Sequence, residues 1–209
     1  MGKIALFFMV AVFLIALGEI AIAFYPEDIE RLLKTNECRK CEFLEADLSS
    51  CNLKGAILKE AMFNGANLRW IHLDGANLEK AVLENADLSW ATLTSANLKE
   101  AFLRSANLTL ADLEGADLER AYLLKANLNK ANLNEANLTA ANLESADLRW
   151  ANLKEATLIR ANLKFAHLEK SNLFGAVIDN AFLDGAFLEG AIWIDGTICK
   201  EGSIGKCIR

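Results

Sequence analysis

Hydrophobic residues recur every five positions along most of the chain. Counting every fifth residue from Ala46 to Ala191 gives 30 positions, of which 27 are Ala, and the count from Leu48 to Trp193 gives 27 Leu in 30. Helices turn every 3.6 residues and strands alternate every two, so neither keeps a five-residue pattern on one face. The period predicts a coil in which each unit forms one short side and one turn, with Ala and Leu pointing inward.

A second period of twenty residues indicates how many units make one coil. Two series of residues spaced by twenty alternate in charge: Lys59, Glu79, Lys99 and Glu119, and Glu60, Lys80, Glu100 and Arg120. Alternation of this kind is expected if residues twenty apart stack in adjacent coils. Four units then complete each coil, which predicts a four-sided tube.

The side chain at the last position of each unit alternates between small and large from one unit to the next. Small residues occupy every second unit: Gly55, Gly65, Gly75, Asn85, Ser95, Ser105 and Gly115. Glu, Trp, Lys, Leu and Arg occupy the units between them. Since Gly and Asn accept positive φ most readily, we expect positive φ at alternate corners only.

The unit A-[D/N]-L-x-x, as in ANLNK, ADLER and ADLRW, resembles the repeat of the pentapeptide-repeat family, over residues 36–193. The resemblance implies an all-β solenoid, a right-handed quadrilateral β-helix. About eight coils at about 4.8 Å each would give a rod about 38 Å long.

The N-terminal segment, residues 1–23, has the features of a secretory signal. A basic start precedes the apolar stretch 4–17, and the sequence AIA ends at Ala23. Cleavage would leave a mature chain that begins at Phe24. The alternative is a retained membrane anchor, although Glu19 interrupts the apolar run.

Both ends of the repeat carry a different kind of sequence. In residues 24–35, Pro26 and two acids come first and Lys34 comes near the end, which predicts a short capping helix. Its apolar residues are expected to lie on the first coil: Ile29, Leu32 and Leu33. Residues 194–209 are rich in Gly and predict a C-terminal cap.

The outward second position becomes apolar around the last coil, at Val177, Phe182, Phe187 and Ile192. We expect the C-terminal tail to fold back over these side chains; the alternative is that a partner covers them.

The five cysteines fall at the two ends of the repeat. Cys199 and Cys207 lie in the C-terminal cap, where a disulfide is expected in an exported protein. Cys38, Cys41 and Cys51 occupy inward positions. They are interpreted as core residues or as a structural pair holding the N-terminal cap; the alternative is a thiol redox centre at the CRKC sequence.

Composition argues against several classes of chemistry. The net charge is −6 and no run of Lys or Arg occurs, so no direct nucleic-acid contact is expected. Neither His72 nor His167 belongs to a catalytic set, and the acidic residues spread over the surface. Three thiols without a nearby His do not supply four zinc ligands. We therefore expect no enzymatic activity, no cofactor and no metal.

Large apolar residues line up on the predicted outer wall. One corner column, interrupted only by Lys130, contains Trp70, Trp90, Leu110 and Trp150. A second column on a neighbouring face contains Met62, Val82, Phe102 and Tyr122. Each column is either a ladder that steadies the coils or a docking strip for a protein, since Trp is common at binding hot spots.

The sequence thus predicts a non-enzymatic interaction scaffold, a monomer or weak dimer, exported to a periplasm or thylakoid lumen. Its protein partner would contact Trp70, Trp90, Leu110, Trp150, Phe102 and Tyr122. The membrane would be involved only through an uncleaved signal segment. The resemblance also offers an alternative function, because some family members mimic duplex DNA and bind DNA gyrase. The signal segment, the interspersed basic residues and the Cys-bearing tail depart from those members.

Overall fold

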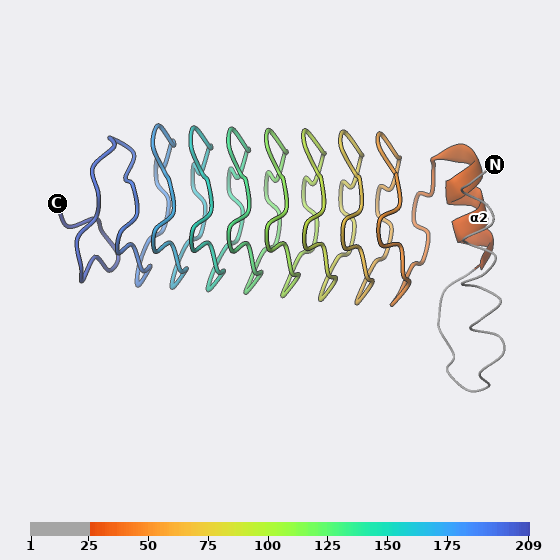
Figure 1. The fold of residues 1–209 in the computed structure, drawn as a ribbon, viewed down its shortest axis with the longest axis horizontal. Helices are drawn as coiled ribbons and strands as arrows, with labels where there is room; N and C mark the ends of the chain where they lie inside the picture. Colours follow the sequence, from red (N-terminus) through yellow and green to blue (C-terminus); the bar gives the residue numbers. More distant parts are fainter. Residues whose placement is uncertain (1–25) are drawn as a thin grey trace.

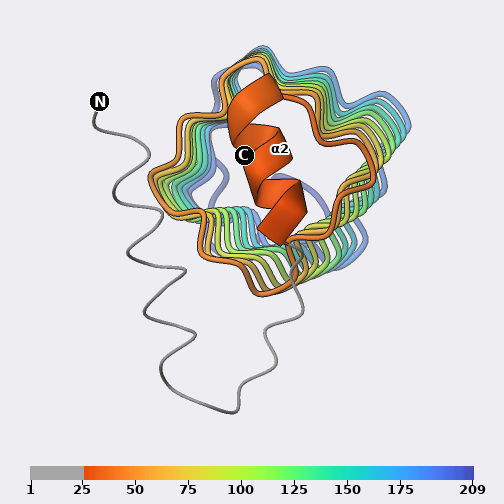
Figure 2. The ribbon, with the colours of Figure 1, turned by 90° about the vertical axis from the view of Figure 1, so that its right-hand side faces the viewer.

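The computed structural model describes residues 26–209, which wind into a tube of stacked coils with a nearly square outline (Figures 1 and 2). Helix α2 (Pro26–Thr35) lies across one end, and the C-terminus lies at the other. The predicted signal segment and its cleavage point between Ala23 and Phe24 lie outside the described residues. Within the described part of the chain, no helix is long and apolar enough to cross a bilayer.

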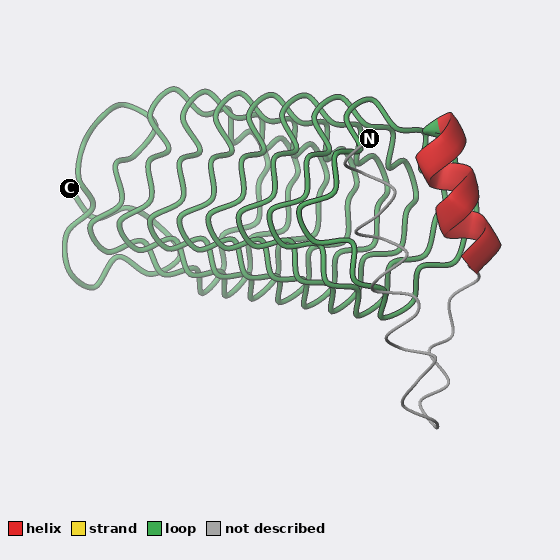
Figure 3. Ribbon diagram, turned by 45° about the vertical axis from the view of Figure 1, so that its right-hand side comes forward, coloured by secondary structure: helices red, strands yellow, loops and turns green. Residues whose placement is uncertain are grey.

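Adjacent coils pair in parallel with a register of twenty residues. Asn107 pairs with Asn127, and the same relation repeats from coil to coil. Figure 3 shows the regular stack of coils. Two hydrogen bonds join the coils at each such pair: Leu108 N–H donates to the Asn127 carbonyl at 2.7 Å, and Asn127 N–H donates to the Ala106 carbonyl at 2.9 Å. These short backbone ladders confirm the predicted four units per coil.

Every corner, not every second one, adopts positive φ. From Lys40 to Gly190 each fifth residue lies in the left-handed region, including Trp70 at 60° and Leu110 at 60°. The expectation of alternate corners is therefore wrong. The Ala111 N–H donates to the Leu108 carbonyl at 3.0 Å across the corner, which is the geometry of a type II turn. The repeated turn requires this φ whatever residue occupies it, so the alternation follows side-chain size rather than backbone conformation.

The interior of the tube contains the Ala and Leu columns, as predicted. Nearly all of these residues are fully buried. Where Phe63 replaces Leu, its ring stacks on that of Phe43 in the preceding coil, with centroids 4.9 Å apart. Where Ser171 replaces Ala, its hydroxyl donates to the Leu168 carbonyl at 2.7 Å. The one polar group in the Ala column is thus satisfied within its own turn.

The predicted alternation of charge produces ion pairs between coils. Lys59 lies 2.8 Å from Glu79, and Lys99 lies 3.2 Å from Glu119. A similar contact joins Lys80 to Glu100 at 3.5 Å. These exposed pairs contribute little stability individually, but they interleave both signs of charge along the wall.

Helix α2 rests on the first coil through one stripe of side chains. Leu32 is buried and Ile29 packs against the core, as expected. Leu33, by contrast, is half exposed. It follows Leu32 by one position, about 100° around the helix, so the two leucines cannot both face the coil.

The C-terminal tail does not cover the apolar side chains of the last coil. It runs antiparallel against the end of the tube, where Ile204 pairs with Phe187 and Ile198 pairs with Ile192. Four side chains stay more than a third exposed: Val177, Phe182, Phe187 and Ile192. The tail folds back on the last coil as expected, but the expectation that it covers these side chains is wrong. It pairs with the backbone at the tube's edge rather than packing over the side chains on its walls.

Candidate functional site

The first aromatic column follows one corner of the tube. Trp70 and Trp90 stack with centroids 4.7 Å apart and an interplanar angle of 11°. They remain 47% and 42% exposed. Leu110 follows in the next coil, and Trp150 lies further along, where the Lys170 ammonium sits 4.6 Å from its ring centroid. The coil spacing of about 4.8 Å places successive corner residues at stacking distance.

The second column follows the middle of a flat side. Phe102 and Tyr122 stack with centroids 4.9 Å apart and an interplanar angle of 2°. The parallel bridges continue this column to Val82 and Met62. Phe102 is 37% exposed and Tyr122 is 48% exposed, so this wall carries a second preformed aromatic pair.

The two columns are separate strips. Within one coil, Phe102 lies on the side that ends at the Ser105 corner. The next side carries Asn107 and ends at the Leu110 corner. One whole polar side therefore lies between the columns. The second column thus lies on the side next to the one that ends at the first column's corner, as the sequence predicts. A partner that binds flat against one strip would not contact the other.

The stacking decides what these strips can bind. The inner ring faces of Trp70 and Trp90 cover each other, and Lys170 covers one face of Trp150. A strip that stacked nucleobases would need open ring faces. Stacking also holds the exposed parts of each pair in one orientation, so a partner would bind them at low entropic cost. This arrangement is suited to apolar side chains of another protein.

The polar sides contain Asn and Asp ladders that the sequence analysis did not assign a role. Asn107 Oδ1 accepts the N–H of Thr109, two residues on, at 3.2 Å. Asn107 Nδ2 donates to Asp87 Oδ1, twenty residues earlier, at 3.0 Å. One side chain thus supports its own turn and joins two coils. The A-[D/N]-L motif is the signal that could have identified this role.

A polar cluster on another side involves one of the two histidines. The Thr92 and Thr94 hydroxyls donate to Asp74 at 2.8 and 2.7 Å, and Lys54 lies 3.1 Å away. Because the one hydroxyl proton of Thr92 goes to Asp74, its oxygen accepts a hydrogen bond from His72 Nδ1–H at 3.2 Å. A nucleophilic Thr would instead donate to the histidine, so this cluster is not a catalytic triad.

The same cluster shifts the acidity of Asp74. Partial burial acts to raise the pKa of Asp74. The hydrogen bonds from Thr94, Thr92 and Lys54 and the charge of Lys54 outweigh it and lower the pKa to about 2.

As the pH falls from about 4 to about 2, we expect the free energy of unfolding to decrease more in the wild-type protein than in the Asp74→Asn variant. Because the folded-state pKa of Asp74 lies below its ordinary value, its stabilisation is complete above that value. It disappears as the pH falls through the folded-state pKa. Denaturant unfolding of both proteins at several pH values measures the difference. Parallel pH profiles would contradict the assignment.

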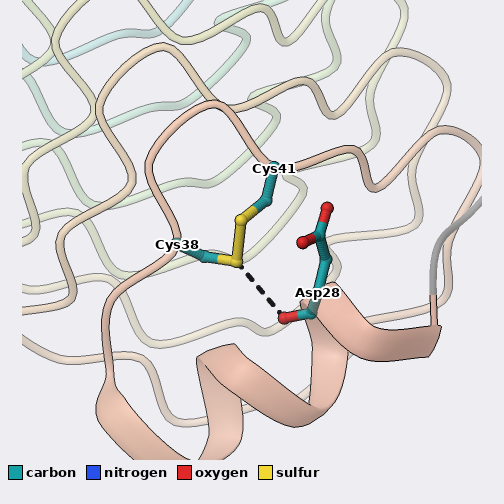
Figure 4. A group of neighbouring side chains, drawn as sticks. All are labelled: Asp28, Cys38 and Cys41. Carbon is teal, nitrogen blue, oxygen red and sulfur yellow. Dashed lines mark hydrogen bonds between the residues drawn. A yellow bond between two sulfur atoms is a disulfide. The ribbon is translucent and has the colours of Figure 1, made fainter.

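The cysteines lie at the two ends of the tube. Cys38 and Cys41 form a disulfide beneath α2 and are 0% and 2% exposed (Figure 4). Cys199 and Cys207 form a second disulfide in the tail. Cys51 is free and half-buried; burial, with a smaller contribution from Asp47, raises its pKa to about 11. Thiol exchange needs an accessible thiolate, and none of these positions supplies one.

Sequence and structure comparisons identify similar proteins. A family model described as "Pentapeptide repeats" matches residues 41–79, 71–109, 86–123, 118–155 and 151–190. A search of curated proteins gave no match.

Several solved structures are similar to this chain. HetL, a pentapeptide repeat protein involved in heterocyst differentiation regulation in Nostoc sp. strain PCC 7120, is 31% identical; the match covers 82% of this chain and 98% of HetL, with a TM-score of 0.37. QnrB1, a plasmid-mediated fluoroquinolone resistance protein, is 17% identical over 74% of this chain and 81% of that chain, with a TM-score of 0.37. A pentapeptide repeat protein from the Arabidopsis thaliana thylakoid lumen is 29% identical over 52% of this chain and 66% of that chain, with a TM-score of 0.14.

Proposed function

We propose that the chain, which belongs to the pentapeptide-repeat family, is a non-enzymatic docking scaffold for a protein partner. Members of this family fold as right-handed quadrilateral β-helices. They are generally structural or interaction proteins rather than enzymes. About eight coils would lie between two end structures, α2 and the tail. Each end structure would cover backbone groups that an open coil would expose to edge-to-edge association.

One observation carries this proposal: the stacked pair of Trp70 and Trp90. Both indoles are over two-fifths exposed. Their backbones are fixed at corners with φ of 60° and 63°, a left-handed conformation that recurs in every unit. A large aromatic pair that is already ordered loses little conformational entropy when a partner binds. Leu110 and Trp150 extend the strip along the corner, and Phe102 and Tyr122 supply a matched pair on a different side.

The experiment compares two double variants. Trp70→Ser/Trp90→Ser is expected to abolish crosslinking to the partner that wild-type protein captures in native cells. Its thermal midpoint should fall only slightly, because a stacked pair contributes about 0.5–1.5 kcal/mol. Phe102→Ser/Tyr122→Ser removes a comparable stack on another side and should keep the partner. Mass spectrometry of crosslinked material identifies which protein is lost.

Two outcomes would count against the docking strip. Loss of the partner in both double variants would show that any damaged column disrupts binding. An unfolding transition in Trp70→Ser/Trp90→Ser far below that of wild type would mean that the column chiefly holds the coils together.

We also propose that the protein is exported. This rests on the signal-like segment 1–23, together with two cysteine pairs that are joined in the structure, since disulfides persist in oxidising compartments.

Intact mass measurement of protein from fractionated native cells tests this. We expect a chain beginning at Phe24 in an exported fraction, with both pairs alkylated only after reduction. Cys51, with its raised pKa, should react slowly until the protein is denatured. A full-length, fully reduced chain in the cytoplasmic fraction would contradict export and would make the gyrase alternative the one to test.

A further inference from the structure

Three metal-ligating side chains meet beneath helix α2. Asp28 belongs to the first turn of the helix, and Cys38 and Cys41 belong to the first coil (Figure 4). One carboxylate oxygen and the two sulfur atoms all lie within 4.8 Å of one another. Cys38 Sγ also lies 3.2 Å from the Asp28 carbonyl oxygen. The sequence offers three thiols and no nearby His as zinc ligands; docking of α2 adds a carboxylate that sequence spacing did not indicate.

We propose that, once its disulfide is reduced, this cluster binds one Zn²⁺ through Cys38 Sγ, Cys41 Sγ and an Asp28 carboxylate oxygen, with water as the fourth ligand. A phosphine reductant cleaves the disulfide with one water molecule: the phosphine takes the oxygen and becomes the phosphine oxide, and the two protons of the water complete the two thiols. Zn²⁺ then displaces those two protons and binds the thiolates. The cysteine Cα atoms are 5.4 Å apart, and the C-x-x-C spacing is one at which two cysteines bind a single zinc ion.

The surroundings of the cluster suit a zinc site. Both cysteines are almost fully buried, so two thiolates there would be costly unless a cation neutralised them. The Glu42 N–H donates to Asp28 Oδ2 at 3.0 Å, which orients the carboxylate as an outer hydrogen bond orients a metal ligand. The ion would therefore join α2 to the first coil. The helix would stay attached at the end of the tube under reducing conditions as well as oxidising ones.

The test measures zinc bound to the full-length chain. The protein is reduced with a phosphine, freed of reductant, mixed with ZnCl₂ and desalted, and the retained zinc is measured with a chromophoric chelator. We expect one zinc ion per reduced chain and none per oxidised chain. Co²⁺ in place of Zn²⁺ should give the intense visible bands of tetrahedral thiolate coordination.

Three variants locate the ligands. Cys38→Ser/Cys41→Ser should abolish retention, whereas Cys199→Ser/Cys207→Ser, which removes the other pair, should leave one zinc ion bound. Asp28→Asn keeps an oxygen for the Glu42 N–H but lacks the carboxylate charge, and should weaken affinity about tenfold or more. Asp28→Asn retains both cysteines, so it remains informative if the double Ser variant misfolds.

Other results would overturn the proposal. Reduced wild-type protein that retains no zinc would do so, as would zinc retention that depends on Cys199 and Cys207 or is unchanged in Asp28→Asn. None of these readouts involves the tryptophan strip. Failure of the zinc site would therefore leave the docking function untouched, and failure of the docking function would leave the zinc site untouched.

Discussion

Replacing Leu123 with Ala is expected to lower the free energy of unfolding by about 2–5 kcal/mol. Leu123 is fully buried, and the residues at its position in the adjacent coils, Leu103 and Leu143, are buried as well. The coils on either side are held by backbone hydrogen bonds, such as that from Leu123 N–H to the Asn142 carbonyl at 2.7 Å. These coils cannot move closer to each other to fill the space left by the shortened side chain, so the Leu123→Ala variant keeps most of its cavity.

The adjacent residue provides the control. Leu124 lies at the turn, half-buried and pointing outward, so Leu124→Ala should cost less than about 1 kcal/mol. Urea unfolding of wild type and the two variants, followed by circular dichroism, measures both changes. Similar losses would show that the tube interior is no better packed than its wall.

The sequence predicted the inward columns and the twenty-residue register because both are imposed at every unit. One misplaced Ala or Leu would put the wrong side chain in the core. The corner conformation was predicted less well. At Trp70 and Leu110 residue preference opposes a left-handed φ, yet both adopt it. Hydrogen bonds from the neighbouring coils outweigh a local cost of about 1–2 kcal/mol.

The remaining differences involve contacts between segments outside the strict repeat. Antiparallel pairing of Ile198 and Ile204 with the last coil leaves the apolar wall exposed, and no five-residue pattern could have shown the direction of the tail. The approach of Asp28 to Cys38 and Cys41 likewise depends on how α2 docks. The placement of the two aromatic columns is not one of these differences, since it follows from counting units within one coil.

Replacing Ala121 with Leu should destabilise the protein by about 1–3 kcal/mol, although the new residue is as apolar as its surroundings. Ala121 is fully buried, and its column neighbours Ala101 and Ala141 are buried too. The added carbons would press against the adjacent coils. Backbone hydrogen bonds fix those coils, as the 2.9 Å bond from Tyr122 N–H to the Ala101 carbonyl illustrates. Overpacking of a rigid interior forces strained rotamers or a local break in pairing.

The matched control is Ala140→Leu, the same substitution at a corner. Ala140 is exposed with φ of 56°, and Leu110 already occupies a corner at 60°. We expect a change within about 0.5 kcal/mol in denaturant unfolding. If both substitutions were tolerated equally, the interior would have room beside the Leu columns. The five-residue period would then require an explanation other than close packing of a small residue beside a large one.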